Sequence, residues 1–252
     1  MPARVMQALV AESKTIEPDL CWLRLRAPDI GASLRAGQFV ALIQRERLDP
    51  YLPTHIHPTH IASDEVGCLL SPGDRERWLL ALREGDLVQA TAPLGTPFAL
   101  EPHTRNLLLV SEGMSGLPLL PLAQEAAGRK MEASFLAWSP YSRAGLLPPG
   151  LLPSSAEYRP AIGMDALAES LAATLQWADQ VCAAGSPELH LALWEQIRRV
   201  RLRYVKGFCQ VLIRRPMMCG TGLCGQCQIR LRRGLVQVCT DGPVFDLKDV
   251  IG

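Results

Sequence analysis

The stretch Met218-Cys-Gly-Thr-Gly-Leu-Cys-Gly-Gln-Cys-Gln228 carries three cysteines on one short segment, and a fourth cysteine follows at position 239. The four residues Cys219, Cys224, Cys227 and Cys239 have the spacing C-x4-C-x2-C-x11-C. Three thiolates on one tight loop and a fourth from a neighbouring strand are the ligand set of a plant-type [2Fe-2S] cluster. The interleaved glycines agree, because a backbone that wraps inorganic sulfide needs positions without Cβ and N-H groups that point at sulfur. This stretch therefore predicts a C-terminal lobe that is organised around a cluster.

A structural zinc site is the alternative, since four cysteines are also a zinc ligand set. Zinc sites of this kind favour two C-x2-C turns, whereas the first spacer here has four residues and contains Gly220 and Gly222. The spacing therefore favours iron-sulfur over zinc.

The charge around the motif is one-sided. Between Ile197 and Thr240 there are ten Arg and Lys residues and no Asp or Glu. An oxidised [2Fe-2S] unit with four thiolates carries a formal charge of about -2, which such a field would stabilise on reduction. The same basic surface could dock an acidic partner, and a solvated basic face is the other interpretation.

Composition sets the class of protein. The chain has 252 residues, of which 48% are hydrophobic and 20% charged, so it has room for two modest globular domains and an appendage. The net charge of +1 gives no pull toward nucleic acid, and no nucleic-acid reading module accompanies the basic residues. The segment from Met1 to Lys14 lacks the apolar core of a signal peptide. We therefore expect a cytoplasmic protein without a membrane span that binds no nucleic acid.

The remaining cysteines are scattered among apolar neighbours. In a reducing compartment we expect them to be small buried residues and not disulfide partners. They are Cys21, Cys68, Cys182 and Cys209.

Hydrophobic patterning divides the chain into three predicted parts, with a fold class of mixed β and α/β. Residues 1-101 show short alternating strands between Pro and Gly breaks, which is typical of an antiparallel β-barrel. Residues 102-200 alternate strands and helices, which predicts a Rossmann-like α/β domain with four or five parallel strands. Residues 201-252 form the small [2Fe-2S] lobe.

The predicted elements follow from the same patterning. Strands are expected at 4-10, 21-26, 38-43, 87-91, 106-110, 132-138 and 180-184, helices at 75-83, 117-128, 164-177 and 187-199, and a loop at 139-160.

The order of barrel, α/β domain and C-terminal cysteine motif resembles the electron-transfer subunit of class 1B dihydroorotate dehydrogenases, in the ferredoxin-NADP reductase superfamily. The most specific matches are the cysteine loop itself and Val238-Cys-Thr-Asp-Gly-Pro-Val-Phe245. Supporting matches are Ala36-Gly-Gln-Phe39, Trp78-Leu-Leu-Ala-Leu-Arg-Glu-Gly-Asp86 and Pro93-Leu-Gly-Thr-Pro-Phe98. The resemblance covers nearly the whole chain.

In that family FAD accepts hydride from NADH, and the cluster passes electrons singly to a catalytic partner. A flavin is needed because hydride carries two electrons and an iron-sulfur centre accepts one. The resemblance thus implies an electron-transfer subunit of a hetero-oligomer, not a complete enzyme, with a dihydroorotate dehydrogenase catalytic subunit as partner. It also implies FAD contacts from His55, Pro93, Leu94 and Gly95 and cluster ligation by the four cysteines.

The flavin-binding strand departs from the family pattern. The family's Arg-Pro-x-Ser, whose guanidinium clamps the FAD pyrophosphate, is Leu52-Pro-Thr-His55 here, and leucine cannot neutralise a phosphate. The Gly-Thr pair before the Trp-Leu helix is replaced by Arg75-Glu76, where Arg75 or Arg77 could supply the missing positive charge.

The nicotinamide side departs further. The family's Gly-Gly-Gly-Ile-Gly turn is Ser111-Glu-Gly-Met-Ser115, which places Glu112 where a dinucleotide phosphate expects backbone N-H groups. The family's Cys-Gly-Pro is Ala184-Gly-Ser186, and its acidic Asp-Asp-Gly-Ser segment is absent after Trp138. We therefore expect NAD(H) binding to be weak or lost.

Two hypotheses remain. The first is a [2Fe-2S] electron-transfer subunit that relays electrons between a flavin, nicotinamide or protein donor and a separate catalytic oxidoreductase subunit. The second is a scaffold or docking subunit of a larger redox complex, which has lost its FAD and NAD sites and keeps only the cluster. The two differ in whether FAD is retained.

The segment Tyr51-Leu-Pro-Thr-His-Ile-His-Pro-Thr-His-Ile61 holds three of the five histidines, His55, His57 and His60. His-rich tracts can bind metal. On a strand His55 and His57 share a face, but Pro58 bends the chain, so convergence of the third ring is not expected. We expect instead that His55 replaces the family's flavin-binding hydroxyl, or that the tract fills a vacated groove.

Overall fold

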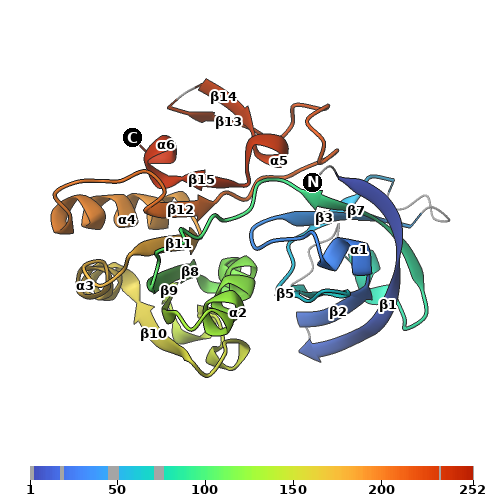
Figure 1. Cartoon of the computed structure of the whole chain (residues 1–252), viewed down its shortest axis with the longest axis horizontal. Helices are drawn as coiled ribbons and strands as arrows, with labels where there is room; N and C mark the ends of the chain where they lie inside the picture. The colour runs from blue at the N-terminus through green and yellow to red at the C-terminus, as the bar shows by residue number, and fades with distance from the viewer. Residues whose placement is uncertain (1–2, 18–19, 45–50, 71–76, 233, 252) are drawn as a thin grey trace. The chain divides into compact units, whose positions relative to one another are not determined.

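The computed structural model describes residues 3-17, 20-44, 51-70, 77-232 and 234-251 (Figure 1). The chain forms two compact units. The first unit consists of Met1–Pro97, Arg214–Gln228 and Gln237–Pro243, and the second of Phe98–Ile213, Ile229–Val236 and Val244–Gly252. All four cysteines of the predicted cluster belong to the first unit, whereas the domain boundaries at residues 101 and 200 stay a prediction.

The first unit is built on a curled antiparallel sheet with the order β4-β3-β7-β1-β2-β6-β5. Its strands are β1 (Arg4–Glu17), β2 (Leu20–Arg26), β3 (Phe39–Ile43), β4 (Thr54–Ile56), β5 (His60–Ile61), β6 (Glu65–Leu70) and β7 (Leu87–Leu94). Two short helical turns accompany them, α1 (Pro28–Gly31) and the 3-10 turn η1 (Arg77–Ala81). Of the helix expected at 75-83, residues 75 and 76 lie outside the described residues.

Apolar side chains at every second strand position fill the concave side of this sheet. In β2, Cys21, Leu23 and Leu25 are buried while the residues between them are more exposed. Leu23 and Leu25 belong to one cluster with Val40 of β3 and Ile56 of β4. Every second residue of the strand is both apolar in the sequence and buried in the structure. This alternation is why a β-barrel could be predicted for the first part of the chain.

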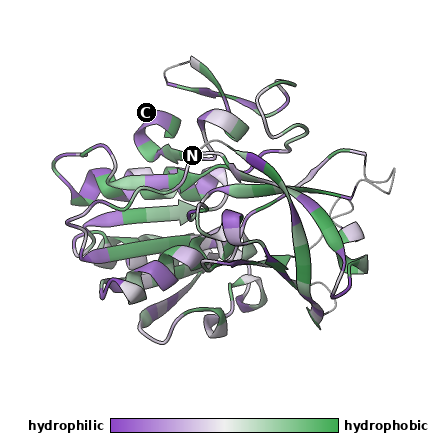
Figure 2. Cartoon of the chain, turned by 45° about the vertical axis from the view of Figure 1, so that its right-hand side comes forward, coloured by the Kyte–Doolittle hydropathy of each residue, from purple (hydrophilic) through white to green (hydrophobic). Residues whose placement is uncertain are grey.

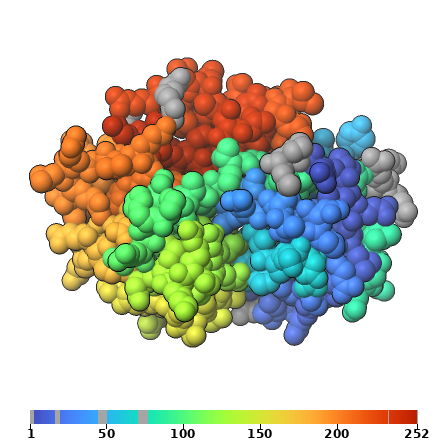
Figure 3. Space-filling view, viewed as in Figure 1, coloured from blue at the N-terminus to red at the C-terminus, as the bar shows by residue number. Residues whose placement is uncertain are grey.

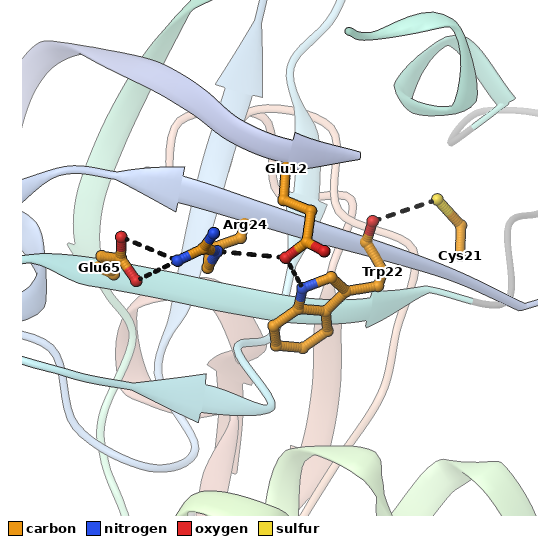
Figure 4. A network of polar contacts seen from close by, with 5 residues as sticks. All are labelled: Glu12, Cys21, Trp22, Arg24 and Glu65. Carbon is orange, nitrogen blue, oxygen red and sulfur yellow. Dashed lines mark hydrogen bonds and ion pairs between the residues drawn. The ribbon is translucent and has the colours of Figure 1, made fainter. Parts of the chain in front are cut away.

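A polar network covers part of the outer face of this sheet (Figure 4). The Arg24 guanidinium donates to both carboxylate oxygens of Glu65, at 3.2 and 3.0 Å, and lies 3.3 Å from Glu12. The Trp22 indole N-H donates to Glu12 at 3.0 Å. On the buried face of β2, the Cys21 thiol donates to the Trp22 carbonyl at 3.6 Å. Because Arg24 and Glu12 are more than one-third exposed, each pair adds little to stability. The contacts connect β1, β2 and β6 across the face of the sheet.

The second unit is an α/β layer structure whose sheet has the order β10-β9-β8-β11-β12-β15. The first five strands are parallel and β15 is antiparallel to β12. The strands are β8 (Asn106–Glu112), β9 (Glu132–Ser139), β10 (Ala156–Ile162), β11 (Gln180–Ala184), β12 (Cys209–Leu212) and β15 (Val244–Asp246). The mixed β and α/β fold class is thereby confirmed.

Helices flank this sheet. They are η2 (Gly113–Leu119) and α2 (Leu120–Gly128) after β8, η3 (Arg143–Gly145) and η4 (Pro149–Leu151) after β9, α3 (Gly163–Thr174), α4 (Pro187–Val200) and α6 (Leu247–Ile251). The hairpin strands β13 (Gln228–Leu231) and β14 (Gly234–Gln237) and the short helix α5 (Val238–Asp241) complete the chain. None of the helices in the described part of the chain is long and apolar enough to cross a membrane.

The central strands of the second unit are continuously apolar. Leu107 to Val110 in β8 are fully buried, as expected for a parallel strand covered on both faces, and Figure 2 shows these strands as largely hydrophobic. Leu108 and Val110 share a cluster with Leu171 of α3 and Leu193 of α4.

The expected loop at 139-160 is wrong in its last part, because β10 pairs in parallel with β9 from Ala156 to Ile162. Only Ala161 of this strand is buried, so it has no apolar alternation that a sequence could reveal. It is an edge strand, which also explains why Pro160 is tolerated in it.

His190 of α4 is a buried histidine whose titration should affect stability. It is 2% exposed, and burial lowers its pKa to about 4, against the opposing effect of the Glu112 and Glu188 carboxylates. Because the unfolded chain binds this proton more tightly, the stabilisation is fully present above about pH 6.5 and is lost as the pH falls toward 4. As the pH falls over that window, we expect the free energy of unfolding to decrease by on the order of 3 kcal/mol because of His190.

The measurement is urea unfolding of the wild type and His190→Gln at pH 7.5 and pH 4.5. The variant should lose less stability on acidification than the wild type. His103→Gln, which changes an exposed histidine of the same unit, is the control and should behave as the wild type. Equal acid sensitivity of His190→Gln and the wild type would contradict the assignment.

Candidate iron-sulfur site

The polypeptide brings the fourth cysteine back to the first three through a hairpin. Cys219, Cys224 and Cys227 lie on the irregular segment that leads into β13, and Cys239 lies on α5 directly after β14. The Val238 N-H donates to the Cys227 carbonyl at 3.2 Å, which fixes the two ends of the hairpin side by side. The eleven-residue spacer of the motif is thus a hairpin that returns Cys239 to Cys227.

The first two cysteines form one pair. Burial raises the pKa of the Cys219 thiol, but hydrogen bonds from the Thr221 and Cys224 backbones and from the Cys224 side chain lower it overall, to about 6. The Thr221 N-H lies 3.5 Å from the Cys219 sulfur. Backbone donors therefore already point at a sulfur that would carry negative charge as a metal ligand.

The last two cysteines form a second pair. Burial and a hydrogen bond with the Cys227 side chain raise the pKa of Cys239 to about 12, while the Gly222 N-H acts in the opposite direction. Two thiols this close do not both ionise readily unless a cation joins them.

The four thiols can take part in one site. Cys219 interacts with the Cys224 side chain, and Cys239 with the Cys227 side chain and with the charge of Cys219. A tetrahedral zinc site needs four ligands around one ion, whereas a [2Fe-2S] cluster held by four thiolates takes two at each iron. The contacts of Cys219 with Cys224 and of Cys227 with Cys239 are compatible with two ligands at each iron.

Two glycines of the cluster loop are in positions where a side chain does not fit. Gly220 has φ +71°, and a Cβ on it would lie 2.4 Å from Nε2 of His55. Gly222 has φ +84°, and a Cβ there would lie 2.8 Å from Oε1 of Gln237 and 3.0 Å from Cγ2 of Thr240. The loop therefore packs directly on β4 and on the α5 region, as a close-wrapped backbone requires.

One edge of the site faces solvent. Cys227 and Cys239 are each 2% exposed, whereas Cys224 is exposed and the neighbouring Leu223 is 89% exposed. The C-terminal segment contributes visibly to the molecular surface in Figure 3. Electrons could therefore leave through the Cys224 edge without crossing much protein.

The histidine tract lies beside this loop. His55 contacts Gly220, and its ring packs on Phe39 with 5.5 Å between ring centroids. His57, which directly follows β4, packs on the same Phe39 at 5.8 Å between ring centroids, so the two rings lie on the same face as expected. Burial, and then the Arg214 charge, lower the pKa of His57 to about 3, so this ring is neutral near pH 7.

The other predicted flavin contacts lie around the same Phe39. Leu94 pairs with Phe39 across β3 and β7, and Gly95 follows with φ +74°. A Cβ on Gly95 would meet Pro243 at 2.6 Å and Phe39 at 2.9 Å. Gly95 is therefore covered by the segment that closes the cluster motif.

The backbone groups of Gly95 and Thr96 form hydrogen bonds within the first unit. The Gly95 carbonyl accepts from the Gln38 side chain at 2.8 Å, and the Thr96 N-H donates to the Gly242 carbonyl at 2.6 Å. Pro93 precedes them in β7 and is only partly buried. The structure thus brings His55, Leu94 and Gly95 together with the cluster segment, and whether they contact FAD stays a prediction.

The positive charge expected for a flavin phosphate has a second candidate source. Of the residues considered for this charge, Arg77 belongs to the described part of the chain, as does Leu52, which replaces the family's arginine. Arg75 and Glu76 lie outside the described residues. Arg214, on the strand exit that leads to the cluster loop, is near enough to His57 to affect its pKa. The sequence around Leu52 does not indicate this residue, because Arg214 comes from a distant segment of the chain.

The structure defines a class of fold, a curled antiparallel sheet joined to a parallel α/β sheet, to which a four-cysteine segment is added. Solved structures share this fold. The chain superposes on the structure titled "Insights into flavin-based electron bifurcation via the NADH-dependent reduced ferredoxin-NADP oxidoreductase structure" with a TM-score of 0.76 and 19% identity, covering 96% of this chain and 89% of that one. A ferredoxin reductase in carbazole 1,9a-dioxygenase gives a TM-score of 0.62 at 18% identity, with 79% of this chain and 66% of that one covered.

Residues 214-251 match the family described as the iron-sulfur cluster binding domain of dihydroorotate dehydrogenase B. A probable electron-transfer subunit of dihydroorotate dehydrogenase B (NAD(+)) from Methanothermobacter thermautotrophicus is 29% identical over 223 residues, 86% of this chain and 80% of the relative. The subunit of that name from Desulforamulus reducens is 24% identical over 99% of both chains. Over most of its length the chain is therefore similar to the electron-transfer subunits of dihydroorotate dehydrogenase B, the resemblance that the sequence motifs indicate.

Proposed function

We propose that this chain is the electron-transfer subunit of a two-component oxidoreductase and carries one [2Fe-2S] cluster on Cys219, Cys224, Cys227 and Cys239. The observation that carries the proposal is the pairing of these cysteines inside the segment that matches the iron-sulfur family. A bound cluster would supply one-electron transfer. The chain's own part is to hold the four thiolates, direct N-H groups at them and leave one edge exposed.

We further propose FAD as the two-electron partner of the cluster, bound on the β4 face of the first unit. Support comes from the ferredoxin-reductase-like fold and from the position of His55 between Phe39 and the cluster loop. His55, Pro93, Leu94 and Gly95 remain the proposed contacts, and Arg214 would supply the positive charge that Leu52 cannot.

The partner is a separate catalytic subunit, and the names of the homologues favour one that oxidises dihydroorotate. The protein would then act in pyrimidine biosynthesis, in the cytoplasm. The test is anaerobic purification of the complex from its source, followed by addition of dihydroorotate. Reduction of the cluster, seen as loss of its visible absorbance, is the expected result.

A complex that contains the cluster but does not bleach with dihydroorotate would overturn the choice of substrate. Release of FAD on denaturing the purified subunit is expected from the flavin proposal. If the purified subunit contains the cluster but releases no flavin, the result would support the alternative, a scaffold subunit without FAD.

A further inference from the structure

The second unit has the topology that creates a dinucleotide site in other α/β proteins. Strand β8 lies between β9 and β11, so the connections that leave the carboxyl ends of β8 and β11 diverge to different parts of the sheet (Figure 1). In open α/β sheets, ligands bind outside the carboxyl ends of the strands at such a switch point. The N-terminus of α4, directly after β11, would offer its N-H groups to a phosphate there.

In this chain a carboxylate of the protein occupies that position. Glu112 is the last residue of β8, and its Oε2 accepts the Ser186 N-H at 2.6 Å. Ser186 is the N-cap of α4. A Cβ on the intervening Gly185 would lie 2.8 Å from Cβ of Glu112, so the glutamate stem packs closely on the turn.

The other donors of the first turn of α4 are also satisfied internally. Pro187 has no N-H. The pKa of the Glu188 carboxyl is lowered by its own backbone N-H and by the Ser186 side chain, so this carboxylate lies at the helix terminus. The Leu189 N-H donates to the Ser186 hydroxyl at 3.4 Å, and the His190 N-H to the Ser186 carbonyl at 3.2 Å. The Ser186, Leu189 and His190 N-H groups of this helix terminus are therefore already bonded within the protein.

The charge at this point is also negative. Glu112 and Glu188 both act on His190, which is buried behind them and whose Nε2 has no hydrogen-bond partner among the described residues. No Lys or Arg takes part in the hydrogen bonds described for this turn. A dinucleotide phosphate would have to displace one carboxylate and approach another, and like charges in contact disfavour binding by several kcal/mol.

We infer that Glu112 acts as a built-in substitute for a cofactor phosphate and closes the dinucleotide site at the β8-β11 switch point. The second unit then keeps the fold of a nicotinamide-binding domain without the binding. This inference rests on the proposed function. Its consequence is that electrons reach this subunit from a protein donor or from its catalytic partner, and not from NADH.

The test is binding of NADH and of ADP to the purified full chain by isothermal titration calorimetry, for the wild type and for Glu112→Ala. The wild type should show no saturable binding up to millimolar ligand. Glu112→Ala removes the charge and frees the Ser186 N-H, so its affinity should rise at least about tenfold, which corresponds to ~1.4 kcal/mol.

Two further variants make the result specific. Glu112→Gln removes the charge but keeps an oxygen that can accept the Ser186 N-H, so it should gain less affinity than Glu112→Ala. Glu125→Ala removes a carboxylate from the exposed surface of α2, where Glu125 pairs with Arg129, and should gain nothing.

Tight NADH binding by the wild type, unchanged in Glu112→Ala, would overturn the inference. So would folded Glu112→Ala or Glu112→Gln protein, judged by circular dichroism, in which neither variant gains affinity. The binding assays do not depend on the cluster. A negative result in them therefore leaves the cluster assignment untouched, because that assignment is tested separately by the iron and sulfide content.

Discussion

Replacing Cys239 with alanine should abolish the cluster while leaving a folded chain. Cys239 is the only cysteine of the four that lies after the β13-β14 hairpin, and it completes the pair with Cys227. With three thiolates, one iron loses half of its protein ligands. We expect iron and acid-labile sulfide to fall to near background and the visible absorbance of the cluster to disappear.

Cys68→Ala is the matched control. Cys68 is a fully buried cysteine of the same unit, in the core between the curled strands, and burial raises its pKa to about 12. Its loss should reduce stability by about 1 kcal/mol and leave the cluster intact. If Cys239→Ala retained full iron and sulfide, or if Cys68→Ala lost them to the same extent, the ligand set would be wrong.

Adding one methyl group at Gly220 should sharply destabilise the cluster loop. Alanine at φ +71° is strained by ~1-2 kcal/mol, and its Cβ would overlap the His55 imidazole at 2.4 Å. Displacing the ring or the loop adds about 1-3 kcal/mol. We expect Gly220→Ala to release its cluster to a chelator at least roughly tenfold faster than the wild type.

Gly225→Ala separates the two contributions. Gly225 has φ +68°, but its nearest contact would be 3.8 Å away, so this variant carries the backbone strain without the clash. Gly220→Ala should therefore lose its cluster faster than Gly225→Ala, and adding His55→Ala to Gly220→Ala should restore part of the difference. Equal rates for the two glycine variants, with no rescue, would show that His55 does not support the loop.

The sequence was sufficient for the features that depend on local pattern. The apolar runs of β8 and β11 and the alternation of β2 have the periods that burial imposes, and the spacing of the cysteines is by itself enough to predict a cluster segment. β10 was missed because an edge strand with one buried residue leaves no period in the sequence.

The features that the sequence could not supply are contacts between distant segments. His55 was expected beside a flavin, and the structure places its ring against Gly220, 165 positions later in the chain. Glu112 was expected to repel a phosphate, and the structure shows it bonded to the Ser186 N-H. The positive φ angles that explain the glycines likewise emerge only from the folded backbone.

The central claim is that these four cysteines hold a two-iron cluster, and electron paramagnetic resonance of the anaerobically purified chain after reduction with dithionite tests it most directly. A [2Fe-2S] cluster that accepts one electron predicts a signal that integrates to about one unpaired electron per chain, with about two irons and two sulfides. A chain that gives no signal and contains about one zinc ion with no sulfide would contradict the account.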